Sequence, residues 1–327
     1  MLMVLKESEM VGEYKIIKPL SKGGFSQIYK ASDPDGKSVI LKYPDPSLIS
    51  DLATYERFRR EFTIGQKLNH PAIPRALALV ENPEGVFIAL EYIEGESLRT
   101  YISNNAPLSL NEALSIADQL SEVVDYLHSN GVYHRDLKPE NIIIGSDGKI
   151  HIIDFGTALL EGTRRVTWRF GSDTFGTPDY MAPEQIQGKR GDARTDVYAL
   201  GTILYEMLTG TVPFPGDNAL SVMNQHLTAN PIPPRKFQSS IPPGIEAIIL
   251  KSIRRNPDER YQSASSLQHD LKNFEELDLS LFPMKPEVAA RGMLSDRQIW
   301  LGTVLVFVGF LVIVALIIII AYLMQHR

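Results

Sequence analysis

Residues 134–156 read His134-Arg-Asp-Leu-Lys-Pro-Glu-Asn141, then Ile142-Ile-Ile-Gly-Ser-Asp-Gly-Lys-Ile-His-Ile-Ile153, then Asp154-Phe-Gly156. Two apolar runs around an Asp-Gly turn predict a β-hairpin. Asn141 and Asp154 flank the two runs, so both fall at the open end of this hairpin and their side-chain oxygens can converge. One carboxylate and one amide oxygen, with space for water and phosphate oxygens, suit Mg²⁺ better than zinc or copper. The stretch therefore predicts a magnesium site.

The loop before the hairpin supplies a second carboxylate. Asp136 stands five residues before Asn141 in a polar stretch, which places it beside the predicted metal site. A carboxylate in that position can accept the proton of a substrate hydroxyl. Taken singly, the ordinary role of a turn residue stays open for this aspartate.

An earlier segment, Leu20-Ser-Lys-Gly-Gly-Phe-Ser-Gln-Ile-Tyr29, places paired glycines between two predicted strands. Gly23 and Gly24 allow a tight loop whose backbone amides can approach a phosphate, although such a pair is more often a plain turn. Lys42 ends the next predicted strand. A lysine there is normally a solvated edge residue, and it gains a role only where a carboxylate and a phosphate lie near it.

Two parts of the chain differ in pattern. Residues 14–92 carry short apolar runs, and Asp33-Pro-Asp-Gly36 between two of them is good turn chemistry for a hairpin. Residues 97–275 show mostly helical spacing, and Ser109 with Glu112 predicts a capping box at the start of one helix.

Ala182-Pro183-Glu184 completes a set of motifs that stand in one order and at one spacing. Together with the loop at 134–141, the Asp154-Phe155-Gly156 triplet and the glycine pair, it resembles the protein kinase family. The resemblance is closest to the bacterial membrane-bound serine/threonine branch, and it covers roughly residues 14–275.

The fold that this resemblance implies is α+β and bilobal. A small β-rich N-terminal lobe is expected at about 14–92 and a large helical C-terminal lobe at about 93–275. The resemblance also implies a hinge at Glu91-Tyr92-Ile93 whose backbone meets adenine, with Leu90 controlling the space before it.

The resemblance further implies two ion pairs and one buried bracing residue. Glu61 rather than Glu56 is expected to pair with Lys42, because Glu61 has the family's spacing to the segment that follows it. Glu184 and Arg260 are expected to form an ion pair of the large lobe. Asp196 is expected to be the buried residue that braces the catalytic loop.

The residues that the resemblance assigns to the site fall into three groups. Asp136 is expected to orient the attacking hydroxyl and take up its proton, and Lys138 to neutralise charge on the γ-phosphoryl group. Asn141 and Asp154 are the expected Mg²⁺ ligands. The expected ATP-binding residues are Leu20, Ser21, Lys22, Gly23, Gly24, Ile28, Lys42, Glu61, Glu91 and Ile93.

Two regions depart from the family pattern. Ser21 and Ser26 replace the first and third family glycines, which bears on ATP affinity. Asp173 stands four residues before Thr177, where many family members carry a phosphothreonine. One hypothesis is that Asp173 mimics this phosphate toward Arg135, and the alternative is an ordinary solvated loop aspartate. The candidates for autophosphorylation are Thr167, Ser172 and Thr174.

Composition excludes several classes of protein. The 327 residues carry a net charge of −6, whereas nucleic-acid binding normally needs a basic field. The chain has no cysteine, which excludes disulfides, cysteine-ligated zinc and thiol catalysis.

The segment from Ile299 to Met324 carries no charged residue. As a helix it would be about 39 Å long, against a hydrocarbon core of about 30 Å, which favours one transmembrane helix over a buried core helix. Residues 1–13 are interpreted as an extension without a signal peptide, 276–298 as a juxtamembrane linker and 325–327 as a tail. We therefore expect a single-pass protein of the cell membrane with its kinase domain in the cytoplasm.

The leading functional prediction is Mg²⁺- and ATP-dependent phosphorylation of serine and threonine in proteins, including autophosphorylation. A pseudokinase scaffold would typically lack Lys42, Asp136 or Asp154, and all three are present. A small-molecule phosphotransferase would lack the Ala-Pro-Glu segment and the peptide-docking region at Thr177. The expected partners are ATP, protein substrates, the lipid bilayer and a second copy of the chain in a homodimer, with no nucleic acid.

Overall fold

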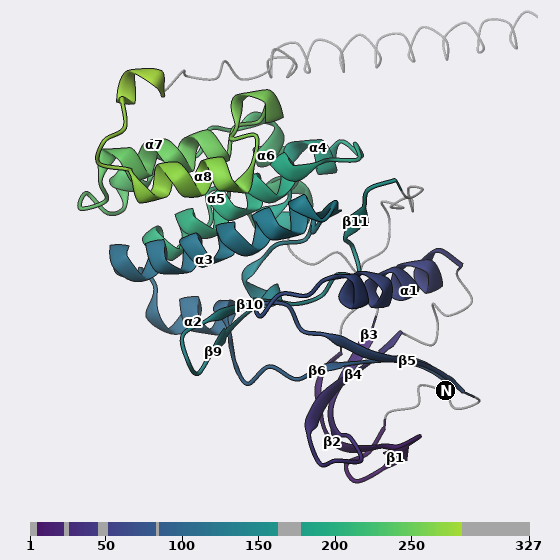
Figure 1. Cartoon of the computed structure of the whole chain (residues 1–327). Helices are drawn as coiled ribbons and strands as arrows, with labels where there is room; N and C mark the ends of the chain where they lie inside the picture. The colour runs from purple at the N-terminus through teal and green to yellow at the C-terminus, as the bar shows by residue number, and fades with distance from the viewer. Residues whose placement is uncertain (1–4, 23–25, 45–51, 83–84, 163–177, 283–327) are drawn as a thin grey trace, which may run out of the picture. The chain divides into compact units, whose positions relative to one another are not determined.

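The computed structural model describes residues 5–22, 26–44, 52–82, 85–162 and 178–282. These residues form a small lobe built on a β-sheet and a larger helical lobe (Figure 1). The predicted α+β, bilobal architecture is therefore confirmed. The expected transmembrane helix at 299–324 lies outside these ranges, and no helix within them is long and apolar enough to cross a membrane.

The small lobe contains a six-stranded antiparallel sheet with the strand order β1-β2-β3-β4-β6-β5. As predicted, Asp33-Pro-Asp-Gly36 closes the β3–β4 hairpin, where the Gly36 amide donates to the Asp33 carbonyl at 3.0 Å. The strands are β1 Met10–Val11, β2 Tyr14–Lys22, β3 Ser26–Ser32, β4 Ser38–Pro44, β5 Ala76–Asn82 and β6 Gly85–Glu91.

Side chains alternate between the two faces of this sheet. Tyr29 and Leu41 are buried in the core of the small lobe. Their neighbours Ile28, Lys42 and Ile88 pair in one row across β3, β4 and β6. Because successive side chains point to opposite faces, this row lies on the face away from that core. Lys42 is therefore directed away from the small-lobe core by strand geometry alone.

The packed part of the small lobe begins before residue 14. Met10 in β1 pairs with Lys15 in β2, and Leu5 and Val11 are buried in the small-lobe core. Part of the expected N-terminal extension therefore contributes apolar surface to this core.

Helix α1 (Leu52–Lys67) lies beside the sheet (Figure 1). It approaches β5 closely at Gly65, where an added Cβ would lie 2.8 Å from the Cβ of Ala76. Ile64 on this helix and Leu68 just after it belong to the core of the large lobe. The helix therefore contacts the sheet and also contributes to the larger core.

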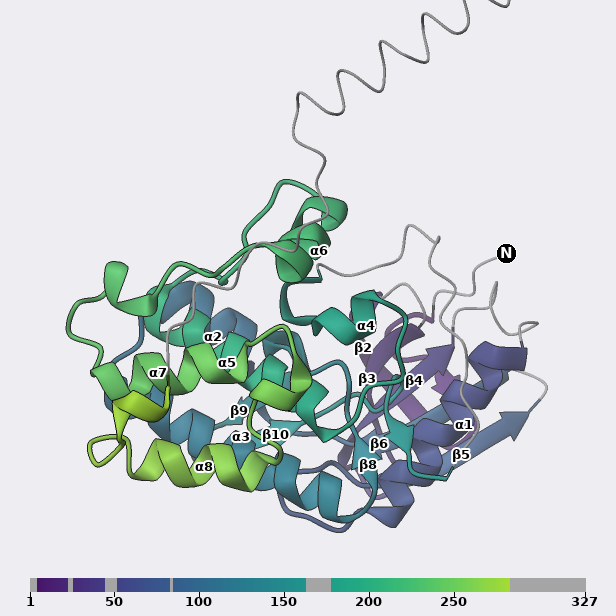
Figure 2. The same ribbon diagram turned by 90° about the horizontal axis from the view of Figure 1, so that it is seen from above.

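The helical lobe is built around α5 (Ala193–Thr209), which is buried along its length from Thr195 onward. Gly201 lets α7 come close, because a Cβ there would lie 2.5 Å from the Cβ of Ser252. Figure 2 shows α5 among the other helices of this lobe. They are α2 Leu98–Asn105, α3 Leu110–Ser129, α4 Pro183–Ile186, α6 Ala219–Thr228, α7 Pro243–Ser252 and α8 Ala264–Lys272.

Short elements complete the large lobe. The predicted capping box at the start of α3 is confirmed, since Ser109 and Glu112 bond reciprocally. The short strands are β7 Gly95–Ser97, β8 Val132–Tyr133, β9 Ile142–Gly145, β10 Ile150–Ile152 and β11 Leu159–Leu160. The 3₁₀ helices are η1 Pro139–Asn141, η2 Pro178–Tyr180, η3 Pro234–Lys236, η4 Pro257–Glu259 and η5 Leu279–Leu281.

The packed chain continues beyond α8. Leu277 and Phe282 lie against the core of the large lobe, and the Phe282 ring centroid is 4.8 Å from Nζ of Lys251. The first residues of the expected linker at 276–298 therefore pack against the helical lobe.

Candidate active site

The predicted hairpin brings the two expected metal ligands together. Ile142 of β9 pairs with Ile152 of β10, and the amide of Ile153 donates to the carbonyl of Asn141 at 2.9 Å. Asn141 and Asp154 therefore stand next to each other at the open end of the hairpin. The predicted hairpin is confirmed, and their joint role as metal ligands stays a prediction.

Asn141 also joins the hairpin to the loop before it. Its Nδ2 donates to the backbone carbonyl of Asp136 at 2.8 Å and to the Asp136 carboxylate at 3.2 Å. The amide nitrogen is used in these bonds, so the amide oxygen is the atom of Asn141 that remains for a cation. Asp136 thus lies beside the paired ligands, as the sequence predicted.

Asp154 has one carboxylate oxygen engaged by the protein. Oδ1 accepts from Nζ of Lys42 at 2.8 Å and from the amide of Gly156 at 3.1 Å. Oδ2 makes no hydrogen bond within the described residues. Asp154 has a φ of +67°, and non-glycine residues held in this region cluster at functional sites. Burial raises the pKa of Asp154, but the charge and the hydrogen bond of Lys42, together with the hydrogen bond from the Gly156 amide, outweigh burial and lower it to about 2.

Lys42 forms a buried pair with Glu61 of α1, the partner that the sequence favoured. Its Nζ donates to both carboxylate oxygens of Glu61, at 2.7 and 2.8 Å, while Glu56 is exposed. Burial lowers the pKa of Lys42, but the charges of Asp154 and Glu61 outweigh it and hold this pKa above its ordinary value. Burial raises the pKa of Glu61 to about 7, against the opposing charge of Lys42.

Asp136 carries one oxygen that the protein leaves open. Nζ of Lys138 donates to its Oδ2 at 2.8 Å, and Oδ1 has no hydrogen bond in the described part of the chain. The side chain is 36% exposed. Partial burial raises the pKa of Asp136, with Lys138 opposing this effect. The carboxylate is therefore both accessible and a better proton acceptor than an ordinary aspartate.

Asp196 of α5 binds the backbone of the loop at 134–141, as expected. Its two oxygens accept from the amides of His134 and Arg135 at 2.9 and 2.7 Å. This contact fixes Arg135 at a φ of +67°. A third bond, at 2.8 Å, comes from His128 in the last turn of α3. Nothing in the sequence around His128 predicted this role.

The expected nucleotide-binding residues lie on the small lobe and the connection after it. Ile28 pairs with Ser21 on one side and with Lys42 on the other. Glu91 is the last residue of β6. The backbone of Ile93, two residues later, makes no hydrogen bond to any described residue. Leu20, 43% exposed, falls at a register shift of the β2–β3 ladder.

Some expected site positions lie outside the described residues. They are Gly23 and Gly24 of the glycine pair, the side chain of Lys22, and the activation-segment residues Thr167, Ser172, Asp173, Thr174 and Thr177. The phosphate-mimic hypothesis for Asp173 therefore stays a hypothesis.

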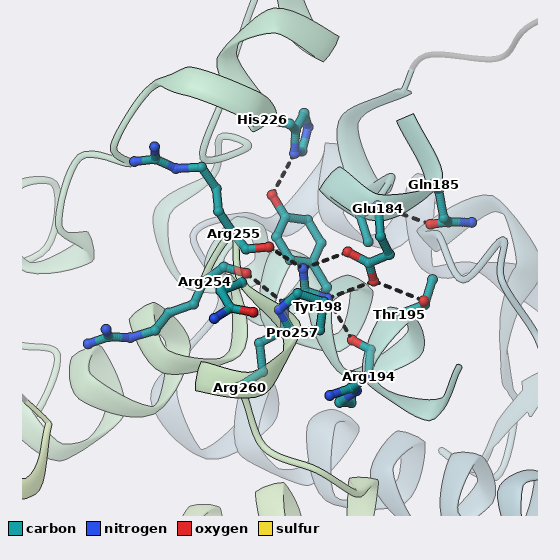
Figure 3. Close-up of polar contacts among 12 residues, drawn as sticks. Glu184, Gln185, Arg194, Thr195, Tyr198, His226, Arg254, Arg255, Pro257 and Arg260 are labelled. Carbon is teal, nitrogen blue, oxygen red and sulfur yellow. Dashed lines mark hydrogen bonds and ion pairs between the residues drawn. The ribbon is translucent and has the colours of Figure 1, made fainter. Parts of the chain in front are cut away.

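The expected ion pair of the large lobe is present and buried (Figure 3). Nη1 and Nη2 of Arg260 donate to the two carboxylate oxygens of Glu184 at 2.8 and 2.7 Å. Thr195 Oγ1 donates to the same carboxylate at 3.0 Å. Gln185, next in sequence, donates through Nε2 to the carbonyl of Arg135 at 2.8 Å and so ties this segment to the catalytic loop.

A second network beside the catalytic loop was not predicted. Arg99 of α2 donates to Glu140 of η1 at 2.7 Å and to Glu206 of α5 at 2.7 Å. Arg99 also contacts the hydroxyl of Tyr180 in η2, which in turn bonds Glu206. Glu140 stands within the quoted catalytic motif, but its partners are far away in the sequence. The network joins η2 to the loop that carries Asp136.

The chemistry of these residues fits a magnesium ion. Mg²⁺ is usually held by one or two carboxylates together with water and substrate phosphates. Asp154 presents an ionised carboxylate with one oxygen open, and Asn141 presents its amide oxygen beside it. The described residues contain no cluster of three or more histidine, aspartate or glutamate side chains that could hold a metal ion by themselves.

A β-rich lobe that carries a lysine–glutamate pair, above a helical lobe that carries an acceptor aspartate and two oxygen ligands, is the arrangement of protein kinases. Residues 14–271 match the protein kinase domain family. The chain belongs to the protein kinase family, and the resemblance seen in the sequence is confirmed.

The curated relatives that it matches are serine/threonine-protein kinases. It is 36% identical over 265 residues to serine/threonine-protein kinase PknB of Mycolicibacterium smegmatis, an alignment that covers 79% of this chain and 42% of the relative. It is 35% identical over 262 residues to serine/threonine-protein kinase PrkC of Bacillus subtilis, covering 80% and 40%. PknB of Mycobacterium tuberculosis is 35% identical over 271 residues, covering 81% and 43%. The chain thus matches about two fifths of the length of these relatives.

Proposed function

We propose that this protein transfers the γ-phosphate of ATP to serine or threonine hydroxyls of protein substrates. The observation that carries the proposal is one connected set of side chains. Lys42 contacts Asp154, Asp154 stands beside Asn141, and Asn141 donates to Asp136. Phosphoryl transfer depends on positioning and charge neutralisation more than on covalent chemistry by the protein. This set supplies a cation, oxygen ligands and a proton acceptor in adjacent positions.

Each residue of the set has a separate task. Lys42, held by Glu61, offers its ammonium group to the α- and β-phosphates. Asp136 directs its open oxygen at the acceptor hydroxyl and takes up the proton as the oxygen attacks. Lys138 contacts Asp136 in the structure and can turn to neutralise charge on the γ-phosphoryl group. The resemblance to protein kinases implies these tasks, and the charges and open atoms of the three side chains support them.

Asn141 and Asp154 would hold Mg²⁺, which would supply charge neutralisation for the phosphates of ATP. Burial raises the pKa of Asp154, but the charge and hydrogen bond of Lys42 and the Gly156 amide together lower it to about 2, which keeps the carboxylate ionised at neutral pH. Lys42 thus favours the charge state that a cation requires on the neighbouring ligand.

ATP binding is assigned to the small lobe and the hinge. The backbone of Glu91 and Ile93 would meet adenine, and the side chains of Leu20 and Ile28 would cover the nucleotide. The backbone amides of the segment Ser21, Lys22, Gly23 and Gly24 would approach its phosphates.

Phosphotransfer by the full chain tests the proposal. Labelled ATP, Mg²⁺ and a generic basic protein acceptor are supplied to the wild type and to the Asp136→Asn variant. We expect the variant to lose about 10²- to 10⁴-fold in rate, the range for loss of a positioned proton acceptor. Asp147→Asn, the same change at the exposed hairpin turn, serves as the matched control and keeps full activity. Absence of transfer by the wild type would favour a scaffold that does not catalyse.

We also propose that the chain is anchored in the cell membrane through residues 299–324, with the kinase domain in the cytoplasm. The support is the uncharged, apolar composition of this segment. Placing arginines at Leu311 and Val312 should oppose insertion by about 2.5–3.5 kcal/mol each. The wild type should sediment with membranes, and the Leu311→Arg/Val312→Arg variant should move to the supernatant. An unchanged distribution of the variant would contradict the anchor.

Autophosphorylation between two copies of the chain is the last part of the proposal. Thr167, Ser172 and Thr174 are the proposed acceptors, and Asp173 is proposed to mimic a phosphate. Mass spectrometry of active protein and the activity of Asp173→Ala test the two ideas separately. Activity unchanged by Asp173→Ala would end the phosphate-mimic hypothesis.

A further inference from the structure

A lysine of β3 has no part in the site described so far. The Nζ atom of Lys30 lies 3.8 Å from the centroid of the Tyr92 ring, and both residues are half-buried. A cation over an aromatic face at this distance is attracted by the ring, more strongly where water is partly excluded. Lys30 makes no ion pair within the described part of the chain. The Tyr92 ring is therefore the partner that the structure gives its ammonium group.

Strand geometry places Lys30 on the same face of the sheet as Ile28. Side chains two apart in a strand share a face, and Tyr29 between them is buried in the small-lobe core on the other side. Lys30 also pairs with Ile40 of β4, which pairs with Leu90 of β6. The lysine therefore lies on the face of β3 that is proposed to cover the nucleotide.

Tyr92 lies where the chain passes from the small lobe to the large lobe. Strand β6 of the small-lobe sheet ends at Glu91. Strand β7 begins at Gly95 and pairs with β9 of the large lobe. Residues 92–94 thus form the connection between the lobes. The two backbone positions proposed to meet adenine, Glu91 and Ile93, stand directly before and after Tyr92.

The contact between Lys30 and Tyr92 therefore joins two walls of the proposed adenine site. One wall is β3 with Ile28, and the other is the connection with Glu91 and Ile93. The sheet does not extend into this connection, because the last residue of β6 that pairs with β4 is Glu91. A contact that holds both walls in place before the nucleotide arrives reduces the ordering cost of binding.

We propose that Lys30 and Tyr92 are positioning residues whose cation–π contact holds the connection between the lobes against β3 and thereby increases the affinity for ATP. The inference rests on the proposed kinase function and deepens it, since it concerns the proposed nucleotide site. Loss of the contact weakens nucleotide binding and leaves both kcat and the KM for the protein acceptor unchanged.

The test uses the full chain with variants of both partners. Lys30→Met removes the charge and keeps an apolar stem. Tyr92→Leu removes the aromatic face, whereas Tyr92→Phe keeps it and removes only the hydroxyl. Lys18→Met is the matched control, because Lys18 is exposed and pairs with Lys30 across the β2–β3 ladder. It removes the same charge from the same region and leaves the contact in place.

Titration with a non-hydrolysable ATP analogue and Mg²⁺ measures binding without phosphotransfer. We expect Kd to rise about three- to tenfold in Lys30→Met and in Tyr92→Leu, the range for a partly buried cation–π contact. The double variant should bind no more weakly than either single variant, because both remove one contact. Tyr92→Phe and Lys18→Met should stay within about twofold of the wild type. Additive losses, or weaker binding in Lys30→Met alone, would overturn the proposal.

Phosphotransfer kinetics separate positioning from catalysis. KM for ATP should rise in Lys30→Met and Tyr92→Leu along with Kd, while kcat and the KM for the acceptor stay at the wild-type values. Tyr92→Phe should restore the wild-type KM for ATP. A fall in kcat with an unchanged KM for ATP would contradict a role in nucleotide binding.

Hydrogen exchange tests the contact without nucleotide or activity. The amide of Glu91, bonded to the carbonyl of Arg75 at 3.0 Å, reports on the end of β6 beside Tyr92. Lys30→Met and Tyr92→Leu should speed its exchange about three- to tenfold, and Lys18→Met should not. Unchanged exchange would overturn the hold on the connection, whatever the activity.

The two measurements also separate this inference from the proposed function. Equal Kd values in the wild type and all variants would reject the inference and leave the kinase function standing. A wild type that binds no nucleotide would reject the kinase function and the effect on ATP affinity together. Faster exchange in the variants would in that case sustain only the hold on the connection.

Discussion

Two buried ion pairs hold this protein together, and they differ in what they leave open. Arg260 and Glu184 lie within the helical lobe, with side chains 0% and 7% exposed. Lys42 and Glu61 join a strand to a helix of the small lobe, with side chains 8% and 4% exposed. By burial alone the two pairs are alike.

Their coordination separates them. Arg260 uses all of its N–H groups on Glu184 and on the carbonyls of Arg194, Arg254 and Arg255. A guanidinium satisfied in this way has no donor left for a ligand.

The Lys42 pair is open on one side. Lys42 also contacts Asp154, whose side chain is 39% exposed and keeps one oxygen without a hydrogen bond among the described residues. A buried ion pair whose donors are all used, such as Arg260–Glu184, stabilises the fold and has no group left for a ligand. The Lys42–Glu61 pair, called here the open pair, also contacts the carboxylate of Asp154, which has an oxygen available for a ligand.

The largest expected effect comes from breaking the Arg260–Glu184 pair, called here the closed pair because every N–H group of Arg260 is used. Glu184→Ala leaves the guanidinium of Arg260 buried without its carboxylate, which should lower the free energy of unfolding by about 3–5 kcal/mol. Urea denaturation of the full chain measures it. Glu259→Ala removes the carboxylate of a more exposed ion pair, Arg254–Glu259. It should lower the free energy of unfolding by less than about 1 kcal/mol. Equal losses in the two variants would erase the distinction between a closed pair and a surface pair.

Breaking the open pair should affect catalysis more than folding. Lys42→Met removes the cation for the phosphates and should lower the phosphotransfer rate about 10²- to 10³-fold. Its cost in stability should be less than half that of Glu184→Ala, because Glu61, whose pKa burial raises to about 7, can take up a proton instead. Lys67→Met at the exposed end of α1 is the control. A stability loss as large as that of Glu184→Ala would show that both pairs are structural.

Acid should lower the stability of the helical lobe through His226 of α6. This histidine is fully buried, and its Nδ1 lies 2.6 Å from the hydroxyl oxygen of Tyr198 in α5. Burial lowers the folded-state pKa of His226 to about 4. The unfolded chain, with an ordinary histidine pKa of about 6.5, binds a proton that the folded chain does not, so stability falls as pH drops from about 6.5 to about 4. The loss should reach about 3 kcal/mol.

The difference between wild type and His226→Phe isolates this effect. Burial raises the pKa of Asp179 to about 6, so this carboxyl titrates in the same range with the opposite sign. Its contribution is common to both proteins and cancels in the difference. A difference in unfolding free energy that does not change between pH 7 and pH 4 would contradict the assignment.

The smallest expected effect comes from moving the open pair without changing its chemistry. Gly65 lies one turn after Glu61 on α1, and a Cβ there would meet the Cβ of Ala76 at 2.8 Å. Gly65→Ala should therefore displace α1 and lower the phosphotransfer rate about tenfold, since small misplacements of catalytic groups are costly. Gln66→Ala, an exposed neighbour on the same helix, should leave the rate unchanged. Full activity of Gly65→Ala would mean that α1 tolerates the shift.

Much of the candidate site could be predicted because its parts are close in the chain. Asn141 and Asp154 are joined by one short hairpin whose Asp-Gly turn is visible in the sequence. Lys42 and Glu61 are 19 residues apart, and the resemblance to a family supplied the pairing. Local turn chemistry and strand alternation are enough to place such residues.

The supporting contacts could not be predicted in this way. Arg99 is 107 residues from Glu206, and His128 is 68 residues from Asp196. A histidine or an arginine in a helical pattern has many possible neighbours, and only packing selects among them. For the same reason the burial of Leu5 in the small-lobe core was not expected.

By itself, then, the sequence determined the hairpin that joins Asn141 to Asp154, the β-rich and helical halves and the capped start of α3, because each is specified by neighbouring residues. Only the tertiary structure decided which buried charged groups have all their donors used and which keep an open oxygen. Those outcomes depend on donors, acceptors and apolar surfaces that meet across large separations in the chain, where no local pattern records the contact.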